Sequence, residues 1–303
     1  MSSDEITLRK LEIFLVFMRE RNLARAAEAL SLSNVSVHKA IHSLEAAVGC
    51  PLFAHRSRSL QPLASAFVLE THASDIIERI QTSVDAARQA AGISPSIFRI
   101  GSLYSLTVAL VPRIINRLKE TVPDCDIELV LGSNADLEAK LHAGDIDAAL
   151  ICVHELARSR RRIITPLFED EIQLARARGS EPARRGADRL ADLRDYDGAP
   201  FVMLSQDFST GRDSYRMFQQ AGITPRVALR ANDIFTLTSL VKGGVGHALL
   251  PGRIDDIYPD ALEFLRVVAA QRVTQTVGLC YLKSRTADAR IVALEQAART
   301  ITA

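Results

Sequence analysis

The fold is decided by the stretch Ala24–Phe53, ARAAEALSLSNVSVHKAIHSLEAAVGCPLF. Small apolar residues recur at helical spacing at its start, until Ser31, Ser33 and Asn34 interrupt them with side chains that prefer turns and helix N-caps. A second apolar stripe at helical spacing follows, made of Val37, Ile41, Leu44 and Val48. The stretch therefore predicts two short helices joined by a polar turn, which is the pattern of a helix-turn-helix.

The polar edge of the second predicted helix is placed to contact DNA. In a helix-turn-helix this helix lies in the major groove, with the residues near its N-terminus at the base edges. The arginine-rich loop after Phe53 would rest on phosphate groups as a wing. An ordinary amphipathic helix pair with a polar outside is the alternative. The residues expected at DNA are Ser33, Asn34, Val35, Ser36, His38, Lys39, His42, Arg56 and Arg58.

The same pattern extends on both sides of the turn. It includes Leu11, Phe14, Ala26, Ala27, Leu30, Ser33, Val37, Ile41, Leu44, Glu45, Gly49, Leu52 and Phe53. These residues resemble the N-terminal signature of the LysR-type transcriptional regulators. The resemblance implies an all-α winged helix-turn-helix DNA-binding domain over residues 1–63. The chain departs from the family's common residues at Asn34, His38, Lys39 and His55, so the resemblance does not give the operator sequence.

Residues 64–92 predict one long helix that carries the seam of a coiled coil. Apolar and small residues repeat there with spacings of four and three, which is typical of a helix that pairs with another. A helix of about 40 Å cannot cover such a stripe by itself. In the family the corresponding helix is the dimerising linker, so we expect a homodimer or homotetramer and an operator with inverted half-sites. The alternative is that the stripe packs on the same chain. The seam residues are Leu69, Ala73, Ile76, Ile80, Ser83, Ala87 and Ala90.

Residues 93–303 alternate predicted strands and helices, which favours parallel sheets covered on both faces. The segments FRIGSLYSLTVALVPRII, LHAGDIDAALI and LVKGGVGHALLP are similar to the periplasmic-binding-protein-like effector domain of LysR-type regulators. The resemblance implies two Rossmann-like α/β lobes. We expect lobe I over 97–163 and 267–303 and lobe II over 164–266, with crossings near Ile163–Pro166 and Leu265–Val268.

Several loops at strand ends carry hydroxyl and amide side chains just before predicted helices. Such loops converge at the ligand crevice of open α/β sheets, where helix N-termini favour anions. We expect them to hold a small carboxylate, although capping of the helices alone would also explain the hydroxyls. The expected effector residues are Ser102, Tyr104, Ser105, Leu106, Thr107, Gly132, Ser133, Asn134, Val153, Ser205, Gln206, Ser209 and Thr210.

A narrower resemblance concerns the effector. The segments ITLRKLEIF, GSLYSLT and LVLGSN are similar to the regulators of malonate utilisation within this family. The resemblance implies that the effector is malonate or a close relative, a compact dianion that suits convergent hydroxyls and amides.

Composition restricts the remaining possibilities. A length of 303 residues with 48% hydrophobic residues suits two domains with real cores. The N-terminus lacks the apolar core of a signal peptide, and no run of about 18 apolar residues occurs, so we expect a cytoplasmic protein without a membrane span. The four cysteines form no CxxC pair and are interpreted as structural, with a peroxide-sensing pair as the alternative.

No cofactor, metal site or catalytic triad is expected, so the chain is predicted not to be an enzyme. His38 and His42 have the spacing of a metal pair but lack an evident third ligand. The competing hypothesis is a cytoplasmic α/β enzyme or small-molecule-binding protein whose N-terminal helices only dimerise. An enzyme would need acid or base groups in its cleft, whereas these loops offer mainly hydroxyls and amides.

Overall fold

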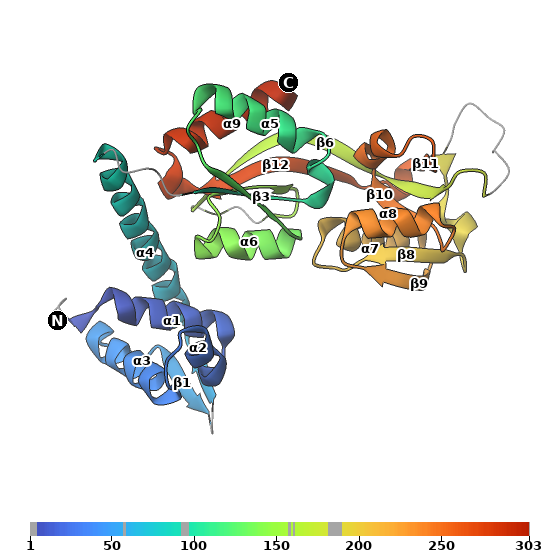
Figure 1. Ribbon diagram of the computed structural model, residues 1–303. Helices are drawn as coiled ribbons and strands as arrows, with labels where there is room; N and C mark the ends of the chain where they lie inside the picture. Colours follow the sequence, from blue (N-terminus) through green and yellow to red (C-terminus); the bar gives the residue numbers. More distant parts are fainter. Residues whose placement is uncertain are drawn as a thin grey trace. The chain divides into compact units, whose positions relative to one another are not determined.

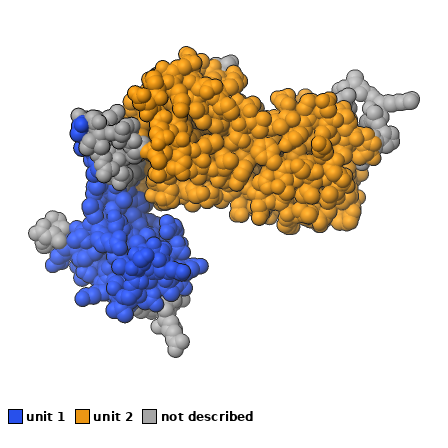
Figure 2. Space-filling view, in the orientation of Figure 1, with its two compact units in different colours: residues 1–94 blue, residues 95–303 orange. Residues whose placement is uncertain are grey.

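The structure is a computed structural model and describes residues 5–56, 59–91, 97–156, 159, 161–180 and 190–302. The chain divides into two compact units, residues 1–94 and 95–303 (Figure 2). Each unit has hydrophobic cores of its own and is described by itself. None of the described helices is both long enough and apolar enough to cross a lipid bilayer.

The first unit contains a helical head, a β-hairpin and one long helix (Figure 1). Phe14 and Phe17 are buried at its centre and meet the ring of Phe53 edge to face, at 6.0 and 5.2 Å between centroids. These aromatic contacts fix the hairpin against the helices. The elements are α1 (Leu8–Glu20), α2 (Leu23–Ala29), α3 (Asn34–Val48), β1 (Phe53–Arg56), β2 (Ser59–Pro62) and α4 (Ala64–Ala90).

Local signals set the ends of α3. The Ser33 side chain accepts a hydrogen bond from the Ser36 backbone N–H at 3.1 Å, as an N-cap does. Gly49 ends the helix with φ of 77°, a left-handed conformation that favours glycine. The predicted stripe is the buried face, with Val37, Ile41 and Leu44 fully covered.

The predicted seam of α4 is divided between two environments. Ala73 is buried in the core of the head, with Leu69 packed partly against it. Further along, Ile76 and Ile80 remain 44% and 37% exposed. The first part of the stripe therefore packs on its own chain, and the second part is left open.

The second unit is an α/β structure of two lobes. Its helices are α5 (Leu110–Thr121), α6 (Asn134–Ala143), α7 (Ser209–Ala221), α8 (Ile234–Lys242) and α9 (Ala289–Thr302), with short 3-10 turns that include η2 (Tyr104–Leu106) and η4 (Gly252–Ile257). Its strands are β3 (Phe98–Ser102), β4 (Ile127–Leu131), β5 (Ala148–Cys152), β6 (Arg162–Ala177), β7 (Leu190–Ala191), β8 (Pro200–Leu204), β9 (Arg226–Ala231), β10 (Ala248–Pro251), β11 (Leu262–Val267) and β12 (Thr274–Leu282).

Lobe I is built on the strand order β4-β3-β5-β12-β6. Its central strand β5 is buried at every position, as expected for a strand covered on both faces. Helices α5 and α9 lie over one face of this sheet and α6 over the other (Figure 1). The carboxyl ends of β3 and β4 lead directly into η2 and α6, which brings two of the predicted loops to one edge.

Lobe II uses the second half of β6, which pairs with β10 and β11, together with the parallel pair β8 and β9. The partners of β6 change between Glu171, opposite Thr274 of β12, and Ile172, opposite Pro251 of β10. β6 thus changes partner after Glu171, and its pairing with β12 begins at Thr274. Both points lie beyond Ile163–Pro166 and Leu265–Val268, where the crossings between the lobes are predicted.

Strand β6 continues past Pro166. A proline cannot donate to a strand ladder and usually ends a strand. Here the pairing jumps from Val277–Phe168 to Gly278–Pro166, so a bulge at Leu167 accommodates the proline and the strand continues. The strand then serves both lobes.

Two further elements differ from the sequence pattern. A helix was expected from Leu106 to Lys119, but the 3-10 turn η2 comes first and α5 begins at Leu110. The strand β11, Leu262–Val267, was read only as part of a crossing. It forms because β6 offers it an edge in lobe II, which no local pattern reveals.

Candidate functional site

The first candidate site is the polar edge of α3. Ser33, Asn34, Ser36, His38 and Lys39 are exposed there, opposite the buried stripe. Val35 is 76% exposed within the same surface. His42, one turn further on, is partly covered. The predicted residues of this helix therefore share one accessible surface.

A chain of polar contacts connects this surface to the hairpin. The His38 and His42 Nε2 atoms are 3.2 Å apart, and His42 Nδ1 lies 2.9 Å from Glu45 Oε2. Glu45 Oε1 accepts hydrogen bonds from the backbone N–H groups of Leu52 and Phe53, at 2.8 and 3.0 Å. Glu45 thus fixes the start of β1 against the exposed helix.

The predicted wing is a β-hairpin rather than an irregular loop. Strand β1 pairs antiparallel with β2 from Phe53 opposite Pro62 to Arg56 opposite Ser59. Arg56 is the last residue of β1, and Arg58 lies outside the described residues.

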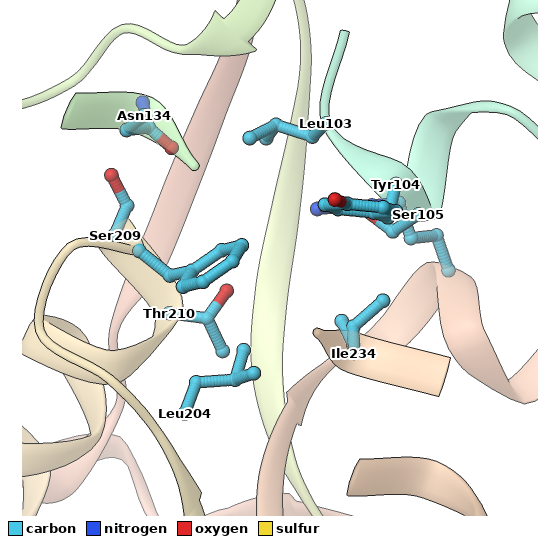
Figure 3. A pocket seen from close by; sticks show the side chains of 10 residues that line it. Leu103, Tyr104, Ser105, Asn134, Leu204, Ser209, Thr210 and Ile234 are labelled. Atoms are coloured by element: carbon cyan, nitrogen blue, oxygen red, sulfur yellow. The ribbon is translucent and has the colours of Figure 1, made fainter. Parts of the chain in front are cut away.

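The second candidate site is a pocket between the lobes of the second unit (Figure 3). Side chains from the starts of η2 and α6 in lobe I face side chains from α7 and α8 in lobe II. The pocket measures about 280 Å³, including the part that opens to solvent. Its lining residues are Leu103, Tyr104, Ser105, Asn134, Leu204, Phe208, Ser209, Thr210, Ile234 and Arg253.

Arg253 supplies the pocket with a positive charge. Its side chain is 14% exposed and pairs with Asp170 at 2.7 Å. Its Nε and Nη2 donate to Ser105 Oγ at 3.1 and 3.0 Å. Because Ser105 Oγ accepts both bonds, its own O–H remains to donate to a ligand.

The N-terminus of α7 adds unsatisfied donors to the same pocket. Its N-cap residue, Phe208, gives no side-chain hydrogen bond, so the first backbone N–H groups are left for an anion. Gly211 is required in this turn, since a Cβ there would lie 2.1 Å from the Ser205 carbonyl oxygen. Ser209 and Thr210 are buried at the start of the helix.

Five of the predicted effector residues line this pocket: Tyr104, Ser105, Asn134, Ser209 and Thr210. Gly132, Ser133 and Ser205 line a neighbouring, more polar depression. Two carboxylates, Asp136 and Asp207, also line it and make it a poor place for an anion.

The other predicted effector residues lie outside both hollows. Ser102, Leu106 and Val153 are buried in the lobe. The Thr107 hydroxyl donates to the Tyr104 carbonyl at 2.7 Å. Ser133, which lines the second hollow, also caps α6, as the capping alternative anticipated. Gln206 is exposed, and its carbonyl accepts from Arg212.

The sequence pattern missed the apolar lining and, above all, Arg253. Leu103 and Phe208 lie within the predicted loops and Leu204 directly precedes one, whereas Ile234 begins α8, away from all of them. Arg253 follows Pro251-Gly252 at the end of β10, which is also a strand-to-helix loop. An arginine at this place carries no local signal of ligand binding, unlike a run of hydroxyl side chains.

The fold and the two sites define a DNA-binding transcriptional regulator with a separate ligand-binding domain. A family model described as "Bacterial regulatory helix-turn-helix protein, lysR family" matches residues 8–66. A second, described as "LysR substrate binding domain", matches residues 94–302. The chain therefore belongs to the LysR family of transcriptional regulators and is not an enzyme.

Individual relatives agree with this assignment. The chain is 43% identical over 293 residues to the malonate utilization transcriptional regulator of Klebsiella pneumoniae, covering 96% of this chain and 94% of that protein. A full-length OxyR variant from Pseudomonas aeruginosa has the same fold, with a TM-score of 0.60 at 18% identity, covering 97% and 95% of the two chains. Full-length CbnR, in a complex with its target DNA, also has this fold, with a TM-score of 0.54 at 19% identity. The match covers 97% of this chain and 99% of CbnR.

Proposed function

We propose that this regulator binds operator DNA through the polar edge of α3 and the hairpin β1–β2, and that it responds to malonate or a close relative in the pocket between the lobes. The observation that carries the effector part is the Arg253–Ser105 pair beside the uncapped N-terminus of α7. The identity with the Klebsiella pneumoniae regulator supports malonate as the first ligand to test.

The chemistry of the pocket favours a small dicarboxylate. One carboxylate would face the Ser105 hydroxyl and the Arg253 guanidinium, which has N–H donors beyond those given to Ser105 and Asp170. The other would meet the Ser209 and Thr210 end of α7, where the backbone N–H groups and the helix dipole stabilise negative charge. The apolar residues Leu103, Leu204 and Ile234 would enclose the short carbon chain between them.

The regulator is proposed to act in the cytoplasm as a homodimer or homotetramer on an operator with inverted half-sites. The open part of the α4 stripe supports this assembly, since Ile76, Ile80 and Val84 are each more than a third exposed in the single chain. Two copies of α4 would cover these side chains and place two α3 helices for two half-sites.

The effector proposal is tested by calorimetric titration of the full chain with malonate, acetate and succinate. We expect heat with malonate and weaker or no binding of acetate, which has a single carboxylate. Arg253→Met should lower the malonate affinity at least tenfold, because it removes the charge and the fork of donors. Arg253→Lys should restore it only in part, since a lysine cannot donate in the same geometry.

The matched control is Lys242→Met, which removes an exposed cation from α8 of the same lobe. It should leave malonate affinity unchanged. No heat with malonate in the wild-type chain, or equal losses in the Arg253→Met and Lys242→Met variants, would remove malonate as the ligand of this pocket.

A further inference from the structure

A buried glutamine of lobe I, Gln275, donates a hydrogen bond to Thr210, which lines the effector pocket. Gln275 lies on β12 and is fully buried. Its Nε2 donates to Asp213 Oδ2 at 2.7 Å and to Thr210 Oγ1 at 3.3 Å, and both partners belong to α7 of lobe II. Its Oε1 accepts from the Cys152 thiol at 3.4 Å. Every polar atom of this amide therefore has a partner.

Asp213 fixes the orientation of this amide. The aspartate is fully buried and also lies 3.1 Å from Arg216 on its own helix and 3.3 Å from His154 of lobe I. If the amide were rotated, its oxygen would face the carboxylate at 2.7 Å, which is repulsive. The amide hydrogens must therefore point toward α7, and one of them reaches Thr210.

This bond sets the direction of the Thr210 hydroxyl. A hydroxyl has one hydrogen to give and two lone pairs to accept with. Because Thr210 Oγ1 accepts from Gln275, its own hydrogen is turned away from that donor, and Thr210 lines the pocket. The hydroxyl thus becomes a donor for an anion.

The same arrangement occurs at Ser105 with the lobes exchanged. Ser105 belongs to lobe I and accepts from Arg253 of lobe II, whereas Thr210 belongs to lobe II and accepts from Gln275 of lobe I. Each of these two hydroxyls is oriented by a donor from the opposite lobe. Both bonds are made only while the lobes are together.

We propose that Gln275 is a positioning residue which, with Arg253, makes carboxylate recognition depend on lobe closure: the crossed hydrogen bonds orient the Thr210 and Ser105 hydroxyls as donors only in the closed arrangement. The proposal rests on the proposed function of the pocket as a carboxylate site. An anion that needs both hydroxyls binds the closed arrangement more tightly and so favours it.

A double-mutant cycle in the full chain tests the positioning role, with malonate as the probe and calorimetric affinity as the readout. Thr210→Val and Gln275→Met should each weaken malonate about tenfold. The double variant should lose no more than either single variant, because Gln275 acts through the Thr210 hydroxyl. Thr210→Ser keeps the hydroxyl and should restore binding, but only while Gln275 is present. The positioning role would be overturned if the loss of malonate affinity in the double variant equalled the product of the two single losses. Unchanged affinity in Gln275→Met would overturn it too.

Hydrogen exchange without any ligand tests the closure separately. The backbone amides of residues 207–216 should exchange faster in Gln275→Met than in the wild type, because α7 loses its bond to lobe I. Gln219→Met, an exposed glutamine on the same helix, is the control and should exchange as the wild type does. If the wild type gives no heat with malonate, the proposed function fails. The hydrogen-exchange comparison needs no ligand and still tests whether Gln275 holds α7 against lobe I. Equal exchange rates in the wild type, Gln275→Met and Gln219→Met would refute the role of Gln275 in holding the lobes together.

Discussion

At the scale of single residues, the pocket depends on side chains whose partners are distant in sequence. Arg253 and Ser105 are 148 positions apart, and Gln275 lies 65 positions from Thr210. Sequence patterns predicted the hydroxyls, because Ser and Thr at helix starts are local signals. They missed the residues that orient these hydroxyls, because an arginine after a strand or a glutamine within one carries no local signature.

Lys39→Ala tests the exposed edge of α3. Lys39 is exposed on the surface that also carries Asn34 and Ser36. Its loss should weaken specific operator binding by about 1–3 kcal/mol if it contacts a base edge, as measured by gel-shift titration at fixed salt. Lys119→Ala, an exposed lysine of α5, should have no effect. Unchanged affinity in the Lys39 variant would contradict the groove assignment.

The cysteines are expected to react very differently with a thiol reagent. Burial raises the pKa of the Cys152 and Cys280 thiols to about 11, and it also raises the pKa of Cys125. Only the thiolate reacts readily, so these three should be inert in the folded protein at neutral pH. Cys50 is exposed and should be labelled first by a disulfide reagent, as followed by mass spectrometry of peptides. Fast labelling of Cys152 and Cys280 would instead revive the peroxide-sensing alternative.

At the scale of elements, the boundaries of α3 were predictable and those of β6 were not. Ser33 and Gly49 terminate α3 through their own backbone preferences, which a sequence displays. The length of β6 depends on partners: β12 on one side of Glu171, β10 and β11 on the other. A proline usually ends a strand, and the bulge opposite Val277 and Gly278 allows β6 to continue past Pro166.

Glu45→Ala should loosen the hairpin from α3. The Glu45 carboxylate is 13% exposed and accepts from the backbone N–H groups of Leu52 and Phe53. Leaving these buried donors without an acceptor costs about 1–3 kcal/mol each. We expect faster hydrogen exchange at the Leu52 and Phe53 amides. Glu45→Gln keeps an acceptor oxygen and should stay close to the wild type, whereas equal exchange in Glu45→Ala would argue against this role.

At the scale of the whole molecule, assembly depends on the open half of the α4 stripe. The heptad pattern predicted one continuous seam. In the structure, Ala73 is buried in the core of the head and Leu69 is partly buried against the same core. A sequence could not separate these two uses, because an apolar residue at helical spacing looks the same whether it packs on its own chain or on another. Of the predicted seam, Ile76 and Ile80 stay exposed, and Val84, next to the seam residue Ser83, is exposed as well.

Ile76→Asp should weaken association of the protomers. A charge placed in an apolar helix pair must be desolvated without a partner, which is strongly unfavourable. Sedimentation at low protein concentration should show a shift toward monomer. Thr71→Asp is the control, since Thr71 is exposed on the opposite side of α4. If the Ile76→Asp and Thr71→Asp variants sediment with the same fraction of oligomer, another surface must hold the protomers together.

The boundary of the lobes at Glu171 and Thr274 has a consequence for how such regulators diversify. Lobe II is the part of the chain between the two ends of the β6–β12 pairing, so it is an insertion into lobe I, whose first strand β3 is the first described strand after α4. A foreign lobe II could be grafted at these two junctions while the DNA-reading part and its connection stay intact. Such a chimera would take over the ligand preference of the donor protein. This requires that its counterparts of Arg253 and Gln275 still hydrogen-bond to the hydroxyls of the opposite lobe.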